Sequence, residues 1–125
     1  MNKALILTLM MMIAALGCDR EKYQQGKVIY DTLCLNCHMS DGTGLGDLYP
    51  NLSKSEYLTI RKSELPCIIK HGIRSDKLST VYMPAHPKIE EASMTNLINY
   101  ITYKWGDQHP VKIKDVMTQL DICVR

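Results

Sequence analysis

The chain has 125 residues, a length typical of one domain. Its 15 Lys and Arg against 13 Asp and Glu give a formal net charge of +2, so it lacks the strongly basic field that binds nucleic acid. We therefore expect no nucleic-acid partner. The chain contains no Phe and a single Trp, and its length allows only a modest core.

The first 17 residues have the pattern of an export signal. Lys3 provides a positive start, residues 4–16 are almost wholly apolar, and small residues lead up to Cys18. The apolar run is too short to span a bilayer. Ala15-Leu16-Gly17-Cys18 resembles a bacterial lipobox, although the Leu favoured three positions before the Cys is missing. Ordinary signal cleavage after Gly17 and a buried N-terminal helix are the alternatives.

These features divide the chain into a signal peptide (1–17), a lipidated tether (18–24) and a domain (25–125). Lipidation of Cys18 would anchor the domain on the periplasmic side of a bacterial membrane. The residues between Cys18 and the first predicted helix can reach at most about 20 Å at ~3.4 Å each. The domain would therefore stay close to the membrane, in a compartment that permits disulfides.

Helices are expected to dominate the domain. The first covers about 23–33, where Val28, Ile29 and Leu33 are apolar at near-helical spacing. A Gly-rich turn follows at 41–46.

Two shorter helices are predicted in the middle of the domain. The first begins at the capping-box pattern Ser53-Lys54-Ser55-Glu56. The second begins at Ser63, carries Pro66 in its first turn and ends at Gly72. Residues 74–88 then form an irregular, mostly extended loop.

The strongest helical pattern covers 90–105 and should pack across the first helix. Its apolar stripe consists of Met94, Leu97, Ile98, Ile101 and Trp105. A final helix is predicted over 114–123, with an apolar face made of Ile113, Val116, Met117 and Leu120. The chain shows no strand pattern of useful length, so the predicted fold class is all-α.

The run Cys34-Leu35-Asn36-Cys37-His38 has the spacing of covalent haem c attachment. Thiols at this spacing can form thioethers with both vinyl groups of one haem, and the His38 imidazole can bind the iron. Three alternatives remain open: a thioredoxin-like redox pair, a structural disulfide, and half of a zinc site completed by Cys67 and His71.

The order of motifs resembles that of the class I (monohaem) cytochrome c family, in a bacterial lipoprotein form. Around the attachment motif, the resemblance rests on Gly26, Tyr30, Asp41-Gly42-Thr43-Gly44, Tyr49-Pro50-Asn51-Leu52, Met83-Pro84, Tyr100 and Trp105. It implies a cytochrome c-like fold in which N- and C-terminal helices cross around one covalent haem, with Gly26 permitting their close approach.

Met83 is the predicted sixth ligand of the haem iron. It lies in a loop, and Val81-Tyr82-Met83-Pro84-Ala85 looks like the ligand loop of that family, whereas Met94 and Met117 fit helical core positions. A His/Met pair raises the reduction potential. His86, three residues later, is the rival ligand and would lower it.

Cys67 and Cys123 are left over once the haem takes its pair of thiols. An oxidising compartment makes a disulfide between them the simplest use. Closing a loop of that length would stabilise the fold by about 4 kcal/mol in the chain-entropy model. Two buried free thiols are the alternative.

The sequence therefore predicts an electron carrier, without substrate chemistry of its own, that exchanges single electrons with membrane-proximal redox proteins. It would act as a monomer or as a subunit of a complex. The main alternative is the haem subunit of a periplasmic oxidoreductase. A zinc-dependent interaction module is a third hypothesis.

Overall fold

The structure is a computed structural model that describes residues 21–46, 48–74 and 82–123. The predicted signal peptide and the lipidation site Cys18 lie outside these residues. Within the described part, no helix combines the length and the apolar character needed to cross a membrane.

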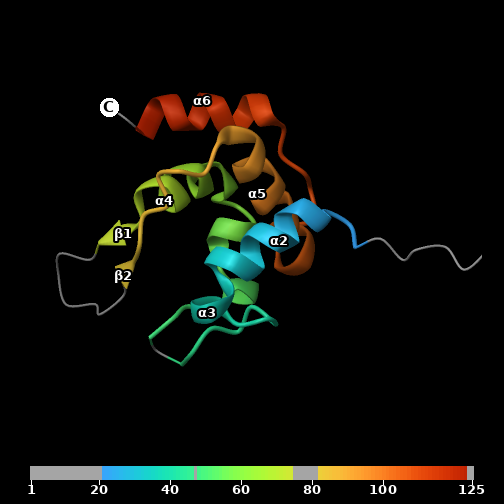
Figure 1. Ribbon diagram of the computed structural model, residues 1–125, viewed down its shortest axis with the longest axis vertical. Coiled ribbons are helices and arrows are strands. Elements are labelled where there is room, and N and C mark those ends of the chain that lie inside the picture. The colour runs from blue at the N-terminus through green and yellow to red at the C-terminus, as the bar shows by residue number, and fades with distance from the viewer. Residues whose placement is uncertain (1–20, 47, 75–81, 124–125) are drawn as a thin grey trace, which may run out of the picture.

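Helices dominate the structure, which confirms the all-α prediction (Figure 1). In chain order the elements are α2 (Gln24–Leu33), α3 (Leu35–His38), the 3-10 turns η1 (Leu52–Lys54), η2 (Glu56–Leu58) and η3 (Lys62–Glu64), α4 (Leu65–His71), β1 (Ile73–Arg74), β2 (Tyr82–Met83), α5 (Glu91–Trp105) and α6 (Ile113–Cys123). The two strands form one antiparallel pair in which Ile73 lies opposite Met83. Strands of two residues are too short to show a sequence period, so the sequence predicted only a loop over 74–88, which includes β2.

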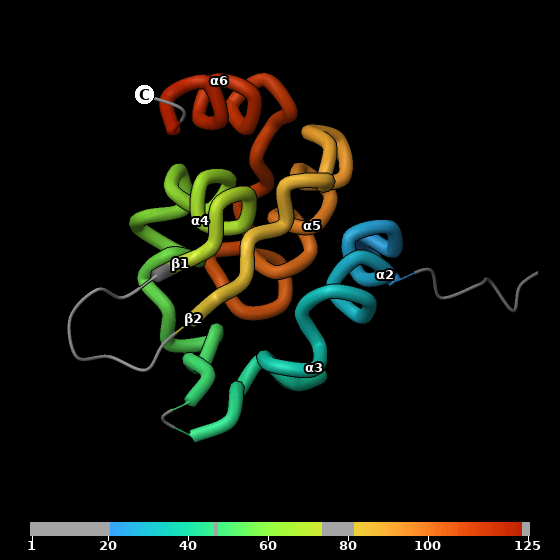
Figure 2. The backbone as a smooth tube through the Cα atoms, turned by 60° about the vertical axis from the view of Figure 1, so that its left-hand side comes forward, coloured from blue at the N-terminus to red at the C-terminus, as the bar shows by residue number. Residues whose placement is uncertain are grey.

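Helix α2 lies across α5 (Figure 2). Gly26 lies at the contact between them. A Cβ atom built at Gly26 would lie 2.6 Å from the Cβ of Tyr100 and would clash with the carbonyl oxygen of Asn96. Any side chain would therefore push the two helices apart. This is the close approach that the resemblance implied.

The predicted apolar face of α2 is wrong in part. Val28 and Leu33 are 54% and 40% exposed, whereas Gly26 and Tyr30 are buried. Residues four apart share one side of a helix, so the glycine that allows contact with α5 also turns Tyr30 inwards. The sequence pattern missed this face because a glycine does not count as apolar.

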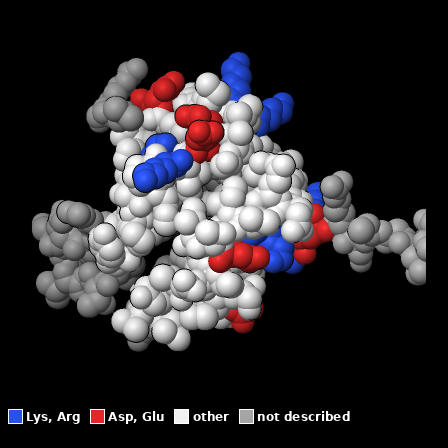
Figure 3. All heavy atoms as spheres, viewed as in Figure 1, with Lys and Arg blue, Asp and Glu red and all other residues white. Residues whose placement is uncertain are grey.

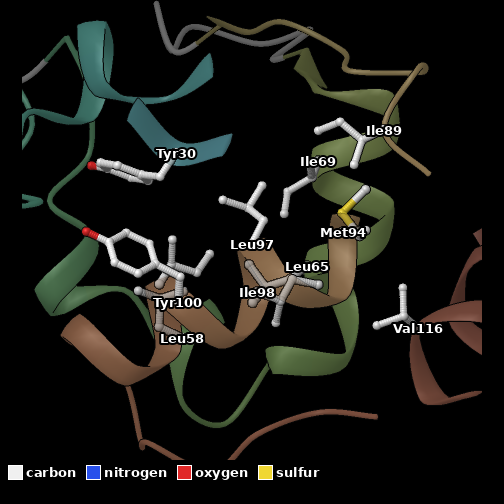
Figure 4. Packing of buried hydrophobic residues seen from close by; sticks show 11 residues of the cluster. Tyr30, Leu58, Leu65, Ile69, Ile89, Met94, Leu97, Ile98, Tyr100 and Val116 are labelled. Carbon is white, nitrogen blue, oxygen red and sulfur yellow. The ribbon is translucent and has the colours of Figure 1, made fainter. Parts of the chain in front are cut away.

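Helix α5 carries the centre of the core. Four members of its predicted stripe are buried: Met94, Leu97, Ile98 and Ile101. Figure 4 shows Leu97, Ile98 and Met94 beside Leu65 and Ile69 of α4. Trp105, the fifth member of the stripe, is half-buried and packs against the core from the end of the helix.

The predicted capping box at Ser53 is wrong. Asn51 is the cap: its Oδ1 accepts hydrogen bonds from the backbone N of Ser53 at 2.8 Å and from the Ser53 Oγ at 2.7 Å. Residues 52–58 then form two 3-10 turns instead of one α-helix. Asn51 caps the first turn two residues before Ser53 would, by accepting from the otherwise free N–H groups of that turn. An Asn side chain is as good a helix cap as a Ser side chain.

Helix α4 ends as the sequence predicts, with Gly72, at φ +73°, after its last residue. It begins at Leu65, two residues later than predicted, because residues 62–64 form the 3-10 turn η3, and Pro66 lies in its first turn. Helix α6 packs on α4 and α5 (Figures 1 and 2). Its buried face is narrower than predicted: Val116 is buried, but Ile113 and Met117 are 46% and 51% exposed.

Two connections join α6 to the rest of the molecule. Asn99 of α5 holds the chain just before α6, because its Oδ1 accepts from the Val111 N at 2.7 Å and its Nδ2 donates to the Val111 carbonyl at 3.1 Å. At the other end of α6, a disulfide joins Cys123 to Cys67 of α4, with Cα atoms 5.6 Å apart. This is the pairing that the sequence analysis favoured.

Candidate functional site

An apolar cavity of about 170 Å³ lies between α2, α4 and α5. Its apolar walls include Leu52, Leu58, Leu65, Ile68, Ile69, Leu97 and Ile101. An outer cavity of about 60 Å³ shares Cys34, His38, Pro50, Ile73 and Met83 with it. The two cavities therefore adjoin, and one apolar ligand can contact the walls of both.

The structure brings four of the predicted site residues to these cavities. Cys34, His38 and Met83 line both cavities, and Cys37 lines the outer one. Met83 is far from the attachment motif in the sequence and reaches it from strand β2. Cys67 and Cys123 lie in the disulfide between α4 and α6.

The imidazole of His38 is held by a backbone carbonyl. Its Nδ1 lies 3.3 Å from the carbonyl oxygen of Pro50. A carbonyl oxygen can only accept a hydrogen bond, so Nδ1 carries the hydrogen and donates it, which leaves the lone pair of Nε2 free to bind a metal. Burial lowers the pKa of His38, and the hydrogen bond to Pro50 opposes this shift only in part. Burial thus favours the neutral ring, which is the form that binds a metal.

The role of Pro50 could not be predicted from the sequence, because every residue has a backbone carbonyl and its use does not depend on the side chain. The available signal was that Tyr49-Pro50-Asn51-Leu52 is one of the motifs that resemble the cytochrome c family. The turn that brings Pro50 to His38 depends on Gly44, whose N donates to the His38 carbonyl at 3.1 Å. The φ of Gly44 is +70°, and a Cβ atom there would lie 2.8 Å from the Pro50 carbonyl oxygen.

Cys34 and Cys37 are both free thiols in the structure. Burial raises the pKa of the Cys34 thiol to about 12, and the nearby Cys37 adds to the shift. The pair therefore forms no structural disulfide here. Among the described residues, no group of three or more His, Cys, Asp or Glu side chains could hold a metal ion. The zinc alternative also loses Cys67, which is bonded to Cys123.

Met83 is positioned by the end of α4. It pairs with Ile73 across the two strands, and three residues later the N of His86 donates to the Ile69 carbonyl at 3.0 Å. Met83 packs against the core cluster and lines both cavities, whereas His86 lines only the outer one. The rival ligand is therefore near the site but does not line the inner cavity that Met83 and His38 share.

The donor set and the cavity fit a haem. The two adjoining apolar cavities are bordered by the imidazole of His38, whose Nε2 is free, by the thioether sulfur of Met83 and by the free thiols of Cys34 and Cys37. These are the groups that bind and attach haem c. A hydrolytic metal site would instead need several carboxylate or imidazole ligands close together.

A family model described as cytochrome c oxidase, cbb3-type, subunit III matches residues 21–101. The chain belongs to this family of c-type cytochromes. A comparison with curated proteins found no match. The matched range of the cytochrome contains Cys34, Cys37, His38 and Met83, and it ends within α5, so α6 lies beyond it.

Family membership confirms the predicted class of this cytochrome, and haem-based electron transfer is the function that the class indicates. Its family description names a subunit of a redox complex.

Proposed function

We propose that this cytochrome binds one covalent haem and exchanges single electrons with redox proteins close to a membrane. Cys34 and Cys37 would form the thioethers, and His38 and Met83 would bind the iron. The observation that carries the proposal is that these four side chains, from two distant parts of the chain, line adjoining apolar cavities.

The residues have distinct tasks in this proposal. When bound, haem supplies an iron that gains and loses one electron. The thioethers fix the position of the ring, and His38 presents Nε2 because the Pro50 carbonyl holds Nδ1. The apolar walls exclude water, which together with a methionine ligand raises the reduction potential. With His38 and Met83 both binding the iron, a substrate would find no free ligand position there, as an electron carrier requires.

The setting of the cytochrome is part of the proposal. Cleavage of residues 1–17 and lipidation of Cys18 would place the domain on the periplasmic side of a bacterial membrane. A family described as an oxidase subunit supports partners embedded in that membrane. The second candidate role, the haem subunit of an oxidoreductase complex, is favoured by the same description.

The test is the mass and the optical spectrum of the protein matured with haem-attachment machinery. We expect the mass of the polypeptide plus one haem, and in the ferric state a band from methionine bound to iron. Met83→Ala should abolish this band and allow carbon monoxide to bind the ferrous iron. Two controls, Met117→Ala on exposed α6 and His86→Ala, should retain it.

A mass without haem would overturn the proposal as a whole. A band that survives in Met83→Ala would overturn the ligand assignment. Absence of the band in the unsubstituted protein, together with carbon monoxide binding to ferrous His86→Ala but not to Met83→Ala, would give the role to the histidine.

A further inference from the structure

The segment that carries Met83, residues 82–89, is attached to α4. Strand pairing joins Met83 to Ile73, and the His86 N bonds to the Ile69 carbonyl. Lys70 Nζ donates to the Ile89 carbonyl at 3.0 Å. Among the described residues, the hydrogen bonds that leave residues 82–89 for other parts of the chain all end on residues 69–74.

The contact at Gly72 is also close. A Cβ atom built there would lie 2.8 Å from the Ala85 N and would clash with the Met83 carbonyl oxygen. The backbones of the two segments therefore touch without an intervening side chain. Because of this contact and the hydrogen bonds, the Met83 segment follows any shift of α4.

Helix α4 cannot hold its own position. It has seven residues, fewer than an isolated helix needs to be stable in water, so packing must fix it. Its inner side, with Leu65 and Ile69, faces the cavity that we assign to haem. On its other side, Cys67 is bonded to Cys123.

Helix α6 connects this outer side of α4 to the core. In Figure 2, α6 lies over α4 and α5. Asn99 fixes the chain before α6 to the long helix α5, Val116 is buried in the middle of α6, and Cys123 at its end carries the disulfide. The family match ends at residue 101. The connection from α5 through α6 to α4 therefore lies largely beyond the part of the chain shared with the family.

We propose that Cys67 and Cys123 are positioning residues for the axial ligand: their disulfide fixes α4 between α5 and α6, and α4 in turn holds Met83 against the iron. The proposal rests on the proposed function, because it takes Met83 as a ligand. Opening the disulfide leaves the thioethers and His38 in place and loosens Met83 alone.

The test compares haem-loaded protein with the disulfide intact and open. Dithiothreitol opens it, iodoacetamide blocks the two thiols, and ferricyanide then returns the iron to the ferric state. The double variant Cys67→Ser/Cys123→Ser gives the same opening without the added groups. In both forms we expect a weaker methionine–iron band and affinity of the ferric iron for added imidazole that is higher by about tenfold, or about 1.4 kcal/mol.

Tyr103→Ala is the matched control for a general loss of stability. Tyr103 packs edge-on to Tyr23, with ring centroids 5.7 Å apart, at the α2–α5 contact and not on α4. This variant should unfold at a lower urea concentration yet bind imidazole as the intact protein does.

Unchanged imidazole affinity in both open forms would overturn the inference, as would an equal gain in Tyr103→Ala. Labelling of Cys67 and Cys123 by iodoacetamide in the native, unreduced protein would also overturn it. Met83→Ala separates the two proposals: if it retains the methionine–iron band, the ligand assignment fails. If it loses the band and opening the disulfide has no effect, only the positioning role fails.

Discussion

The side chain of His38 bonds to a backbone group, the carbonyl of Pro50. Pro50 has a fixed φ and no N–H group, and the turn before it is closed by the bond from the Leu45 N to the Tyr49 carbonyl at 3.2 Å. No side-chain substitution removes the carbonyl. The orientation of the His38 ring is thus determined by the path of the chain, and a partner of this kind typically changes metal affinity by about 10–100-fold.

At the same scale, Asp107 makes the fold sensitive to acid. Lys62 Nζ lies 2.7 Å from its Oδ1, and the His109 N donates to the same oxygen at 3.0 Å. Burial alone would raise the pKa of Asp107, but these hydrogen bonds and the Lys62 charge lower it on balance. A carboxyl group with a lowered pKa stabilises the fold above its unfolded pKa of about 4, and this contribution disappears as the pH falls through the folded value.

We therefore expect Asp107→Asn to lower the free energy of unfolding at pH 7 and to lower it less at pH 3, where part of the contribution of the carboxylate is already lost. Urea denaturation at both pH values measures the difference. Asp31→Asn is the control, because Asp31 pairs with Lys27 on the exposed side of α2, where such pairs contribute about 0.3–0.5 kcal/mol. An equal effect of Asp107→Asn at both pH values would contradict the prediction.

At the scale of elements, a side chain of α5 holds the chain at the beginning of α6. Asn99 of α5 is buried and uses both its carbonyl and its amide group on the backbone of Val111. Without it, the N–H and carbonyl groups of Val111 would lose their partners in a partly buried place. Removing one partner of a buried hydrogen bond costs about 1–3 kcal/mol.

Asn99→Ala should therefore lower the free energy of unfolding by about 2 kcal/mol and speed amide hydrogen exchange in α6 before the rest of the protein. Asn96→Ala is the matched control, three residues earlier on the same helix. Asn96 makes one exposed hydrogen bond, to the Gln25 Oε1 at 2.8 Å, so its loss should change stability by less than about 0.5 kcal/mol. Equal exchange rates of α6 in the two variants would contradict the prediction.

The helices could be predicted where their apolar period is long and their ends carry strong signals. This applies to α5, with Glu90 before it and Gly106 after it, and to α4, with Pro66 and Gly72. On α2 the spacing of apolar residues predicted the wrong buried side, because the contact at Gly26 determines which side faces α5. The attachment motif could be found because it occupies consecutive positions, whereas the hydrogen bond from His38 to Pro50 and the pairing of Ile73 with Met83 arise only when the chain folds.

On the scale of the whole molecule, the region around the cavities has few charges. In the described segments 33–46, 48–50 and 82–88 the charged side chains are Asp41 and Lys88. Exposed apolar side chains lie there instead, namely Leu33, Leu45, Leu48 and Tyr82. In the view of Figure 3 the lower part of the molecule is almost free of coloured atoms, and Lys, Arg, Asp and Glu gather mainly over α6 and near the start of α2.

With a net charge of +2 and a nearly uncharged face at the site, the rate of electron exchange should depend weakly on salt. Stopped-flow oxidation of the ferrous protein by an anionic and by a cationic cobalt complex measures this. We expect both rate constants to change by less than about threefold between low and high ionic strength, since there is little field to screen. A tenfold fall for one reagent alone would show a charged approach to the haem.

The single tryptophan of the chain lies against the loop that follows the attachment motif. A Cβ atom built at Gly42 would lie 2.5 Å from the Trp105 Cε2, so the indole covers the bare Cα of that glycine. The same ring lies 5.1 Å from Tyr30 and 6.1 Å from Tyr100, centroid to centroid. Fluorescence of the Trp105 indole therefore reports whether this loop is packed against α5. In the polypeptide before cofactor insertion, the wavelength of maximum emission distinguishes a chain that is already folded from one that folds only when it binds the porphyrin.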